Sequence, residues 1–268
     1  MTSSAQLCGA EGQHHPMLSF HGLTKQYTDG VKALDGVTFD VPRGEFCVIL
    51  GPSGSGKSTL LRTLNGLTSL SSGCIAVDGV ELKPKSLRSV QRRVAMVHQQ
   101  FNLVERLDVA QNVMSGTVAD AAFWRVLLKW YPKSLRERAC DLIARVGLDE
   151  LHLTRRMGEL SGGQQQRVGI ARAFLLDPDV ILADEPVASL DPATSRDVLT
   201  LLRDAARERG TTVLCSLHQL DLALDFADRI IAMRSGSIIF DGRPDALDRS
   251  TVASIYEGSG LEQSRVAA

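Results

Sequence analysis

The chain has 268 residues, of which 44% are hydrophobic and 23% are charged, and its formal net charge is -1. This composition is typical of a globular protein and excludes a disordered or membrane-embedded chain. A near-neutral charge provides no basic surface for nucleic acid, so we expect no nucleic-acid partner. The five cysteines are odd in number and scattered, which favours reduced thiols in a cytosolic protein.

The N-terminal region predicts a tail followed by a small antiparallel flap. Residues 1–16 mix small and polar types without periodicity, as a flexible tail does. Apolar residues then recur near period two from Met17, and residues 37–41 alternate before a Pro-Arg-Gly turn, so each stretch predicts a strand. Tyr27 is a candidate to stack on an adenine ring, and the alternative is a partly buried surface tyrosine.

A glycine-rich loop follows a predicted buried strand at residues 46–50 and precedes a predicted helix. The loop sequence GPSGSGKS matches the nucleotide-binding pattern G-x-x-x-x-G-K-[ST] completely. Its glycines let successive backbone N–H groups converge on phosphate oxygens at a helix N-terminus. Lys57 is expected to contact the β- and γ-phosphates, and the Ser58 hydroxyl to ligate Mg²⁺. The nucleotide-binding residues predicted here are Gly51, Pro52, Ser53, Gly54, Ser55, Gly56, Lys57, Ser58 and Thr59.

The middle of the chain changes from strand to helix patterns. Short strands are predicted at residues 74–77 and 94–97, and Gln99 after the second could ligate Mg²⁺ through its amide oxygen. Helical periodicity then dominates, which predicts a helical subdomain at about residues 101–165.

Residues 121–131 of that subdomain hold both tryptophans of the chain. An apolar aromatic helix can be core or a docking face for another protein. We favour docking, because so many large apolar groups exceed what a small helical insertion can bury.

The sequence LSGGQQQR at residues 160–167 precedes another predicted helix. A Ser-Gly-Gly turn that opens a helix is a second anion-binding terminus, because its N–H groups and the positive dipole end both favour phosphate. The candidates in this turn are Ser161, Gly162, Gly163 and Gln164.

Two acids follow the apolar run at residues 180–183, which predicts a buried parallel strand. Carboxylates at the end of such a strand lie over the crevice where α/β sheets bind ligands. Asp184 suits the Mg²⁺ shell of a nucleotide site, and Glu185 can polarise the attacking water. A strand that runs into an exposed acidic turn is the alternative, and it leaves the isolated acidic pair unexplained.

The last third predicts a turn at residues 189–192, a helix, and a strand at residues 212–217 that ends at His218. His218 can bridge the γ-phosphate and the catalytic water, or it can be a satisfied histidine at a strand end. Two further strands form a hairpin through Ser235 and Gly236. The predicted organisation is a flexible tail at 1–16, one nucleotide-binding domain at 17–257 with its helical subdomain, and a flexible tail at 258–268.

In this order the motifs resemble those of the ATP-binding subunits of ABC transporters, from Met17 to about Tyr256. The matching segments are the Walker A loop at 51–58, the Q-loop Gln99, the signature LSGGQ at 160–164, the Walker B segment VILADE at 180–185, the D-loop at 189–191 and the switch His218. The sequence between the motifs is similar to the ATPase of bacterial phosphonate importers. The resemblance implies an α/β fold with a RecA-like P-loop NTPase core, an antiparallel β flap and an inserted helical subdomain.

The resemblance also implies a shared active site in a head-to-tail homodimer with ATP and Mg²⁺ as cofactors. Residues 161–163 of one subunit would close on the γ-phosphate that Lys57 of the other holds. The further roles it implies are Ser58, Gln99 and Asp184 on Mg²⁺, Gln164 and Asp191 at the nucleotide, Glu185 as general base, and His218 on the γ-phosphate. The implied partners are membrane permease subunits and, indirectly, a substrate-binding protein, with the chain peripheral on the cytoplasmic face of the cell membrane.

The expected function is therefore ATP hydrolysis that energises import of phosphonate or a related phosphorus oxyanion. Import of another solute, such as a polar amino acid, stays open because an ATPase subunit does not contact the cargo. A soluble ABC ATPase acting on DNA would need a long heptad insertion or a basic face, and the sequence has neither. A regulatory module without turnover would not need Glu185 as a base.

Overall fold

The structure is a computed structural model that describes residues 15–100, 102–117 and 131–257. Residues 1–14 and 258–268 of the predicted tails and the aromatic segment at 118–130 lie outside the described residues. The chain divides into two compact units, unit 1 with Met1–Gln91 and Thr212–Ala268, and unit 2 with Arg92–Thr211. The predicted boundaries of the helical subdomain stay a prediction.

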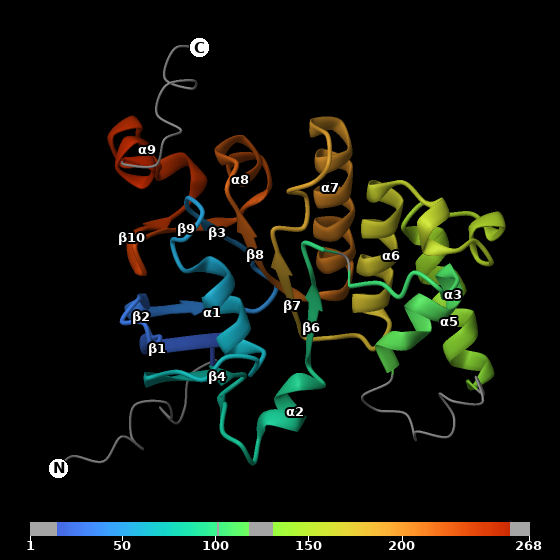
Figure 1. Cartoon of the computed structure of the whole chain (residues 1–268), viewed down its shortest axis with the longest axis horizontal. Helices are drawn as coiled ribbons and strands as arrows, with labels where there is room; N and C mark the ends of the chain where they lie inside the picture. The colour runs from blue at the N-terminus through green and yellow to red at the C-terminus, as the bar shows by residue number, and fades with distance from the viewer. Residues whose placement is uncertain (1–14, 101, 118–130, 258–268) are drawn as a thin grey trace. The chain divides into compact units, whose positions relative to one another are not determined.

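The first sheet of unit 1 is antiparallel, with strand order β2-β1-β4-β5 (Figure 1). Its strands are β1 (Leu18–Gln26), β2 (Lys32–Val41), β4 (Ser72–Val77) and β5 (Val80–Glu81). The pairing of β1 with β2 confirms the predicted flap, and the rings of Phe20 and Phe39 stack between them with centroids 4.3 Å apart. The two-residue strand β5 was not predicted, because it is too short to show alternation and exists through its pairing with β4.

The second group of strands in unit 1 has the order β10-β9-β3-β8. Its members are β3 (Phe46–Leu50), β8 (Thr212–Leu217), β9 (Arg229–Arg234) and β10 (Ser237–Gly242). Strand β3 lies between β8 and β9 and runs parallel to both, and all five of its residues are buried. This position explains its continuous apolar sequence, since a central parallel strand is covered on both faces.

The helices of unit 1 cover these strands and connect them. They are α1 (Lys57–Leu64), α2 (Leu87–Gln91), α8 (Leu220–Phe226), α9 (Arg249–Tyr256) and the 3₁₀ turn η5 (Pro244–Ala246). Only α1 was predicted, from its buried stripe of Leu60, Leu61 and Leu64. The start of α9 is fixed by Asp248, whose side chain accepts a hydrogen bond from the Thr251 N–H at 2.7 Å.

Unit 2 combines a pair of parallel strands with a group of helices (Figure 1). Its elements are β6 (Val94–Val97), α3 (Val109–Met114), η2 (Ser115–Thr117), α5 (Lys133–Arg145), η3 (Glu150–His152), η4 (Met157–Glu159), α6 (Gly162–Phe174), β7 (Val180–Asp184) and α7 (Pro192–Arg209). Helix α6 packs against α3, α5 and α7 and is the centre of the helical part.

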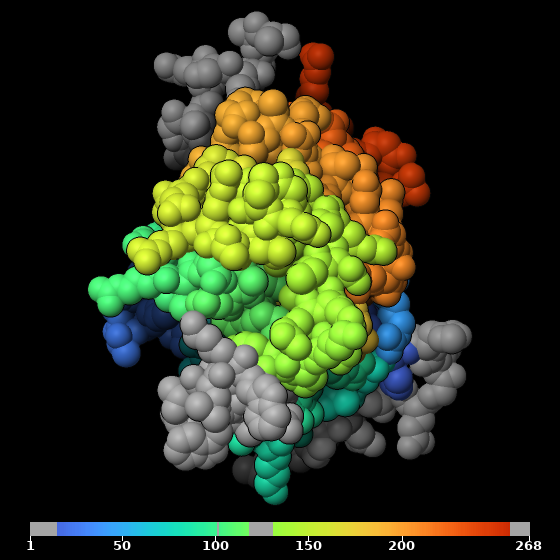
Figure 2. All heavy atoms as spheres, turned by 90° about the vertical axis from the view of Figure 1, so that its right-hand side faces the viewer, coloured from blue at the N-terminus to red at the C-terminus, as the bar shows by residue number. Residues whose placement is uncertain are grey.

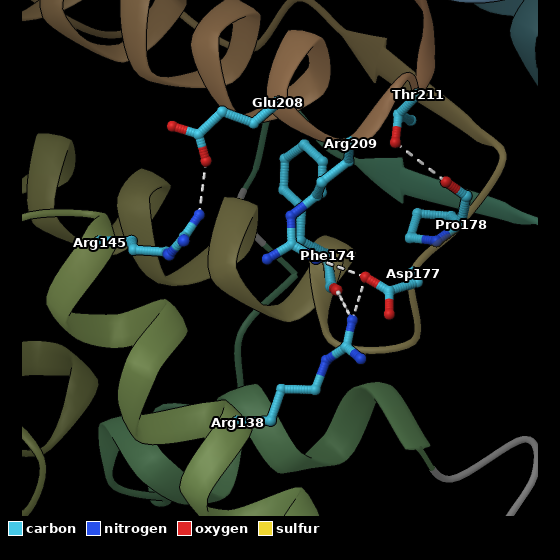
Figure 3. Close-up of polar contacts among 8 residues, drawn as sticks. All are labelled: Arg138, Arg145, Phe174, Asp177, Pro178, Glu208, Arg209 and Thr211. Carbon is cyan, nitrogen blue, oxygen red and sulfur yellow. Dashed lines mark hydrogen bonds and ion pairs between the residues drawn. The ribbon is translucent and has the colours of Figure 1, made fainter.

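A cluster of charged side chains links α5 to the C-terminal end of α7 (Figure 3). Asp177, in the turn after α6, forms ion pairs with Arg138 of α5 and with Arg209 of α7. Arg145 of α5 also donates to the Glu208 carboxylate at 2.5 Å. Helices α5 and α7, which are more than thirty residues apart in the sequence, are therefore connected both through Asp177 and by the direct contact of Arg145 with Glu208.

The cysteines of the described residues are free thiols, and they are Cys47, Cys74, Cys140 and Cys215. Cys47 and Cys215 are buried in adjacent parallel strands, where they pack as small apolar groups. Burial raises the pKa of the Cys47 thiol well above its usual range, so this side chain stays protonated. None of the helices in the described ranges has both the length and the apolarity needed to cross a bilayer.

Candidate nucleotide-binding site

The glycine-rich loop of unit 1 connects the buried strand β3 to the first turn of α1. Gly56, which caps α1, has φ +106, a conformation that residues with a β-carbon rarely adopt. A β-carbon added there would also lie 2.3 Å from the Ala33 carbonyl oxygen. The loop can take this path only with glycine at position 56, and the path brings the glycine-rich loop into the N-terminal end of α1, the end of a helix that favours an anion.

Lys57 lies inside this loop, with 3% of its surface exposed. Its ammonium group donates to the carbonyl oxygens of Gly51 and Pro52, at 2.8 and 3.1 Å. The loop carbonyls therefore hold the ammonium group, so its positive charge lies within the turn that is expected to receive phosphate. Ser53 and Gly54 form the exposed tip, and Ser58 and Thr59 are half-buried in the first turn of α1.

His218 comes from the strand next to the loop. Strands β3 and β8 are parallel and in register, with Leu50 opposite Leu217. Gly51 directly follows β3 and His218 directly follows β8, so both residues lie at the same edge of the sheet. The structure thus brings together two residues predicted as parts of one site, although 167 positions separate them in the sequence.

Tyr256 was missed by the sequence reasoning. Its hydroxyl donates to the His218 carbonyl oxygen at 2.9 Å, from the last residue of α9. No sequence signal identifies this contact, because Tyr256 occupies an ordinary apolar position of a short helix.

Tyr27, the candidate for stacking on adenine, has 41% of its surface exposed, and the Lys25 ammonium group lies 5.1 Å from its ring centroid.

In unit 2, Asp184 is the last residue of β7, and Gln99 follows the neighbouring parallel strand β6. Val97 of β6 lies opposite Ala183 of β7, so Asp184 and the chain leading to Gln99 leave the pair at the same edge. Asp184 is buried, with 6% of its surface exposed, whereas Gln99 is exposed. An amide oxygen and a carboxylate at one strand edge have the chemistry of Mg²⁺ ligands.

Glu185 has a backbone conformation that is uncommon for its residue type. Its φ of 46° lies in the left-handed region, where a β-carbon is disfavoured. Such strain in a residue next to a buried carboxylate marks a candidate functional position. The Glu185 side chain is half-buried in the bend that follows β7.

The predicted signature residues form the N-terminal end of α6. The Ser161 hydroxyl oxygen accepts from the Gln164 N–H at 3.3 Å, and the Gln164 side-chain oxygen accepts from the Ser161 N–H at 3.0 Å. This reciprocal capping box fixes the first turn of α6, which Gly162 and Gly163 begin. Ser161 is exposed, and residues of the segment before α6 face the viewer, in yellow, in Figure 2.

Asp191 forms the equivalent cap of α7. Its side chain accepts from the Thr194 N–H at 3.0 Å, and this hydrogen bond lowers the pKa of Asp191. Thr194 in turn lies against Gly163, so the signature turn and the D-loop turn are neighbours within unit 2. The site residues of each unit are thereby brought together: the loop with His218 in unit 1, and the signature with Asp191 in unit 2.

Comparison with known proteins identifies the family. The sequence pattern of the family described as ABC transporter matches residues 34–188. The protein named Phosphonates import ATP-binding protein PhnC from Hydrogenovibrio crunogenus is 53% identical over 241 residues, which cover 90% of this chain and 89% of that protein. A PhnC 2 protein of the same description from Haloarcula marismortui is 45% identical over 245 residues, covering 90% of each.

Solved structures agree with these sequence relatives. The structure of cbiO1 from Clostridium perfringens, part of the ABC transporter complex cbiONQ, superposes with a TM-score of 0.77 at 29% identity and covers 90% of this chain and 94% of that one. The cassette MJ0796, described as dimeric in a post-hydrolysis state bound to ADP and Pi, gives a TM-score of 0.74 at 33% identity and covers 85% of this chain and 99% of that one. These neighbours confirm the predicted P-loop NTPase fold class. The family pattern and the sequence relatives both cover most of the site residues described above, in the glycine-rich loop, the signature turn and the strand ends. The chain therefore belongs to the ABC transporter family, as an ATP-binding subunit.

Proposed function

We propose that this chain is the ATP-hydrolysing subunit of an importer that takes up phosphonate or a related phosphorus oxyanion. The observation that carries the proposal is the 53% identity, over nine-tenths of the chain, to a protein named as a phosphonate import ATP-binding protein. A separate membrane permease would form the pathway, and a substrate-binding protein would deliver the cargo to it. The chain would act as a peripheral protein on the cytoplasmic face of the membrane.

The active site would be shared between two copies of the chain arranged head to tail. Each copy has two helix ends suited to phosphate, at the start of α1 and at the start of α6. In the proposed dimer, the two helix ends that contact one nucleotide come from opposite subunits. The turn of residues 161–163 would close on the γ-phosphate held by Lys57 of the other copy. The dimeric description of the related cassette MJ0796 supports this arrangement.

The residues present fit Mg²⁺. Ser58, Gln99 and Asp184 offer a hydroxyl, an amide oxygen and a carboxylate, which are hard oxygen donors. Mg²⁺ in nucleotide sites takes the rest of its ligands from nucleotide phosphates and water. The ion would neutralise charge on the β- and γ-phosphates.

The remaining roles belong to side chains at the strand ends. Glu185 would accept a proton from the attacking water, and the His218 imidazole would contact the γ-phosphate. Tyr27, exposed after β1, would stack on the adenine ring. Gln164 and Asp191 would hold the two turns of unit 2 that face the nucleotide of the other copy.

Growth tests the cargo. In a strain that carries this chain as its only subunit of this kind, deletion should abolish growth on a phosphonate as sole phosphorus source and leave growth on inorganic phosphate intact. The wild-type chain should restore growth, and the Glu185→Gln chain should not. Unchanged growth of the deletion strain on phosphonate would mean that the importer carries another solute.

A further inference from the structure

A short chain of side-chain contacts leads from the surface to the signature turn. It begins at Asp149, passes through His152 in the turn η3, and reaches Gln164 in the first turn of α6. The His152 side chain is 15% exposed and that of Asp149 is 63% exposed. All three residues belong to unit 2, and sequence reasoning assigned no role to Asp149 or His152.

The direction of the hydrogen bonds follows from the capping box. The Gln164 oxygen accepts from the Ser161 N–H at 3.0 Å, so the amide NH₂ group of Gln164 is the part that faces His152. The His152 Nε2 atom lies 3.3 Å from this NH₂ group and must therefore accept. The proton of the neutral ring is then on Nδ1, which donates to the Asp149 carboxylate at 2.5 Å. The lowered pKa of Asp149, caused mainly by this hydrogen bond, agrees with that assignment.

The backbone around His152 supports the same geometry. The His152 N–H donates to the Asp149 carbonyl oxygen at 3.0 Å, and the His152 carbonyl oxygen accepts from the Arg155 N–H at 3.0 Å. The neighbouring Gln165 closes the other end of the segment by donating to the Met157 carbonyl oxygen at 3.0 Å. The imidazole is thus presented to Gln164 from a turn that is hydrogen-bonded along its length.

From this geometry we infer that His152, oriented by Asp149, is a positioning residue for the signature turn. It holds the Gln164 amide in the one orientation that completes the capping box. In that box the Ser161 oxygen accepts from the Gln164 N–H, so the proton of the Ser161 hydroxyl is left to donate to an anion. The inference rests on the proposed function, in which this hydroxyl and the N–H groups of α6 meet the γ-phosphate of the facing subunit.

Two substitutions of His152 separate positioning from packing. A glutamine places its side-chain oxygen near the position of Nε2 and keeps the acceptor for Gln164, whereas the shorter asparagine reaches only the position of Nδ1 and lacks it. We expect His152→Gln to keep at least about half of the ATP hydrolysis rate of the full chain, and His152→Asn to lose about ten-fold, the effect of one orienting hydrogen bond. Binding of a fluorescent ATP analogue to the monomer should be the same in both.

The background Gln164→Ala supplies the matched control. If His152 acts through Gln164, His152→Asn should add no further loss to Gln164→Ala, whereas independent effects would multiply. Equal rates for His152→Gln and His152→Asn, or a further ten-fold loss in the Gln164→Ala background, would overturn the inference. Thermal unfolding of each variant identifies any loss of rate that comes from misfolding.

Ser161→Ala distinguishes this inference from the proposed function. A normal ATP hydrolysis rate for Ser161→Ala, together with a rate per chain that is independent of protein concentration, would contradict the proposed shared site itself. A lowered hydrolysis rate for Ser161→Ala together with a normal rate for His152→Asn would contradict only the positioning role of His152 and leave the shared site standing.

Discussion

Gly163 at the start of α6 lies against Thr194 in the first turn of α7, so closely that a β-carbon added at Gly163 would be 2.5 Å from the Thr194 methyl carbon Cγ2. Carbon atoms that are not bonded do not approach this closely, so the contact requires glycine at position 163. It places the phosphate-binding end proposed for α6 beside the cap of α7, where Asp191 accepts from the Thr194 N–H.

We therefore expect Gly163→Ala to lower the free energy of unfolding by about 1–3 kcal/mol, as overpacking does, and to reduce ATP hydrolysis. The added methyl group leaves the backbone N–H in place, so the defect should be steric. Thr194→Ser removes Cγ2, and the double variant should recover most of the stability and the rate. Denaturant unfolding and ATPase assays of both single variants and the double variant measure this, and no recovery in the double variant would contradict it.

Glu185→Gln should keep ATP binding and lower hydrolysis by about two to three powers of ten, because a positioned general base is lost while shape is kept. The measurement is a single-turnover assay beside equilibrium binding of labelled ATP. Hydrolysis at the normal rate would exclude Glu185 as the base.

A mixing experiment tests the shared site. Lys57→Ala removes the phosphate-loop charge and Ser161→Arg blocks the signature turn, so each variant alone should be inactive. In an equal mixture about half of the dimers contain one chain of each kind, and each of these has one intact site of two. The mixture should therefore recover up to about a quarter of the wild-type rate if the sites act independently. A site built within one chain predicts no recovery at any mixing ratio.

Tyr256→Phe removes one hydroxyl and keeps the ring. The lost hydrogen bond to the His218 carbonyl oxygen should cost about 0.5–1.5 kcal/mol of unfolding free energy. If Tyr256 also fixes the position of His218, hydrolysis should fall about two- to five-fold, with no further loss when His218→Ala is already present. Lowered stability with an unchanged rate would limit Tyr256 to a structural role.

Asp177→Asn tests the link between α5 and α7. Burial pushes the pKa of Asp177 upward, but the hydrogen bonds and positive charges of Arg138 and Arg209 outweigh it, so the pKa lies below its usual range. A depressed carboxylate pKa in the folded state adds stability above the unfolded pKa of about 3.9, and this is lost as the pH falls through the folded value.

At pH 7 the Asp177→Asn variant should therefore be less stable by about 0.5–1 kcal/mol, since these pairs are partly exposed. The difference from wild type should shrink as the pH falls from about 5 towards 3. Asparagine tolerates the left-handed φ of 47° at this position, so the comparison isolates the charge. Denaturant unfolding at several pH values measures it, and a difference that is constant across pH would contradict the ionic explanation.

The strands and helices with a strong repeating pattern could be predicted from the sequence. Strand β3 is five buried residues in a row, and the second half of α6 is apolar and buried on most of its circumference, so burial determines both. The short elements α2, α8 and β5 could not be predicted, because each has too few residues for a period and depends on packing or pairing with the remainder of unit 1.

The residues of the candidate site also fall into two groups, those that the sequence reveals and those that it does not. Glycines, Lys57 and the strand-end acids are visible because their chemistry requires particular residues at fixed spacing. The supporting residues Tyr256 and His152 are not, since a tyrosine hydroxyl can reach a carbonyl oxygen from any nearby element and only coordinates locate it. Asp149 looks like an ordinary surface acid until its hydrogen bond to His152 is seen.

The φ of 46° at Glu185 has an evolutionary consequence. Glycine would occupy this backbone conformation without the strain of about 1–2 kcal/mol that a residue with a β-carbon carries there. If Glu185 is the general base, as proposed, turnover rather than robustness determines which residue follows β7.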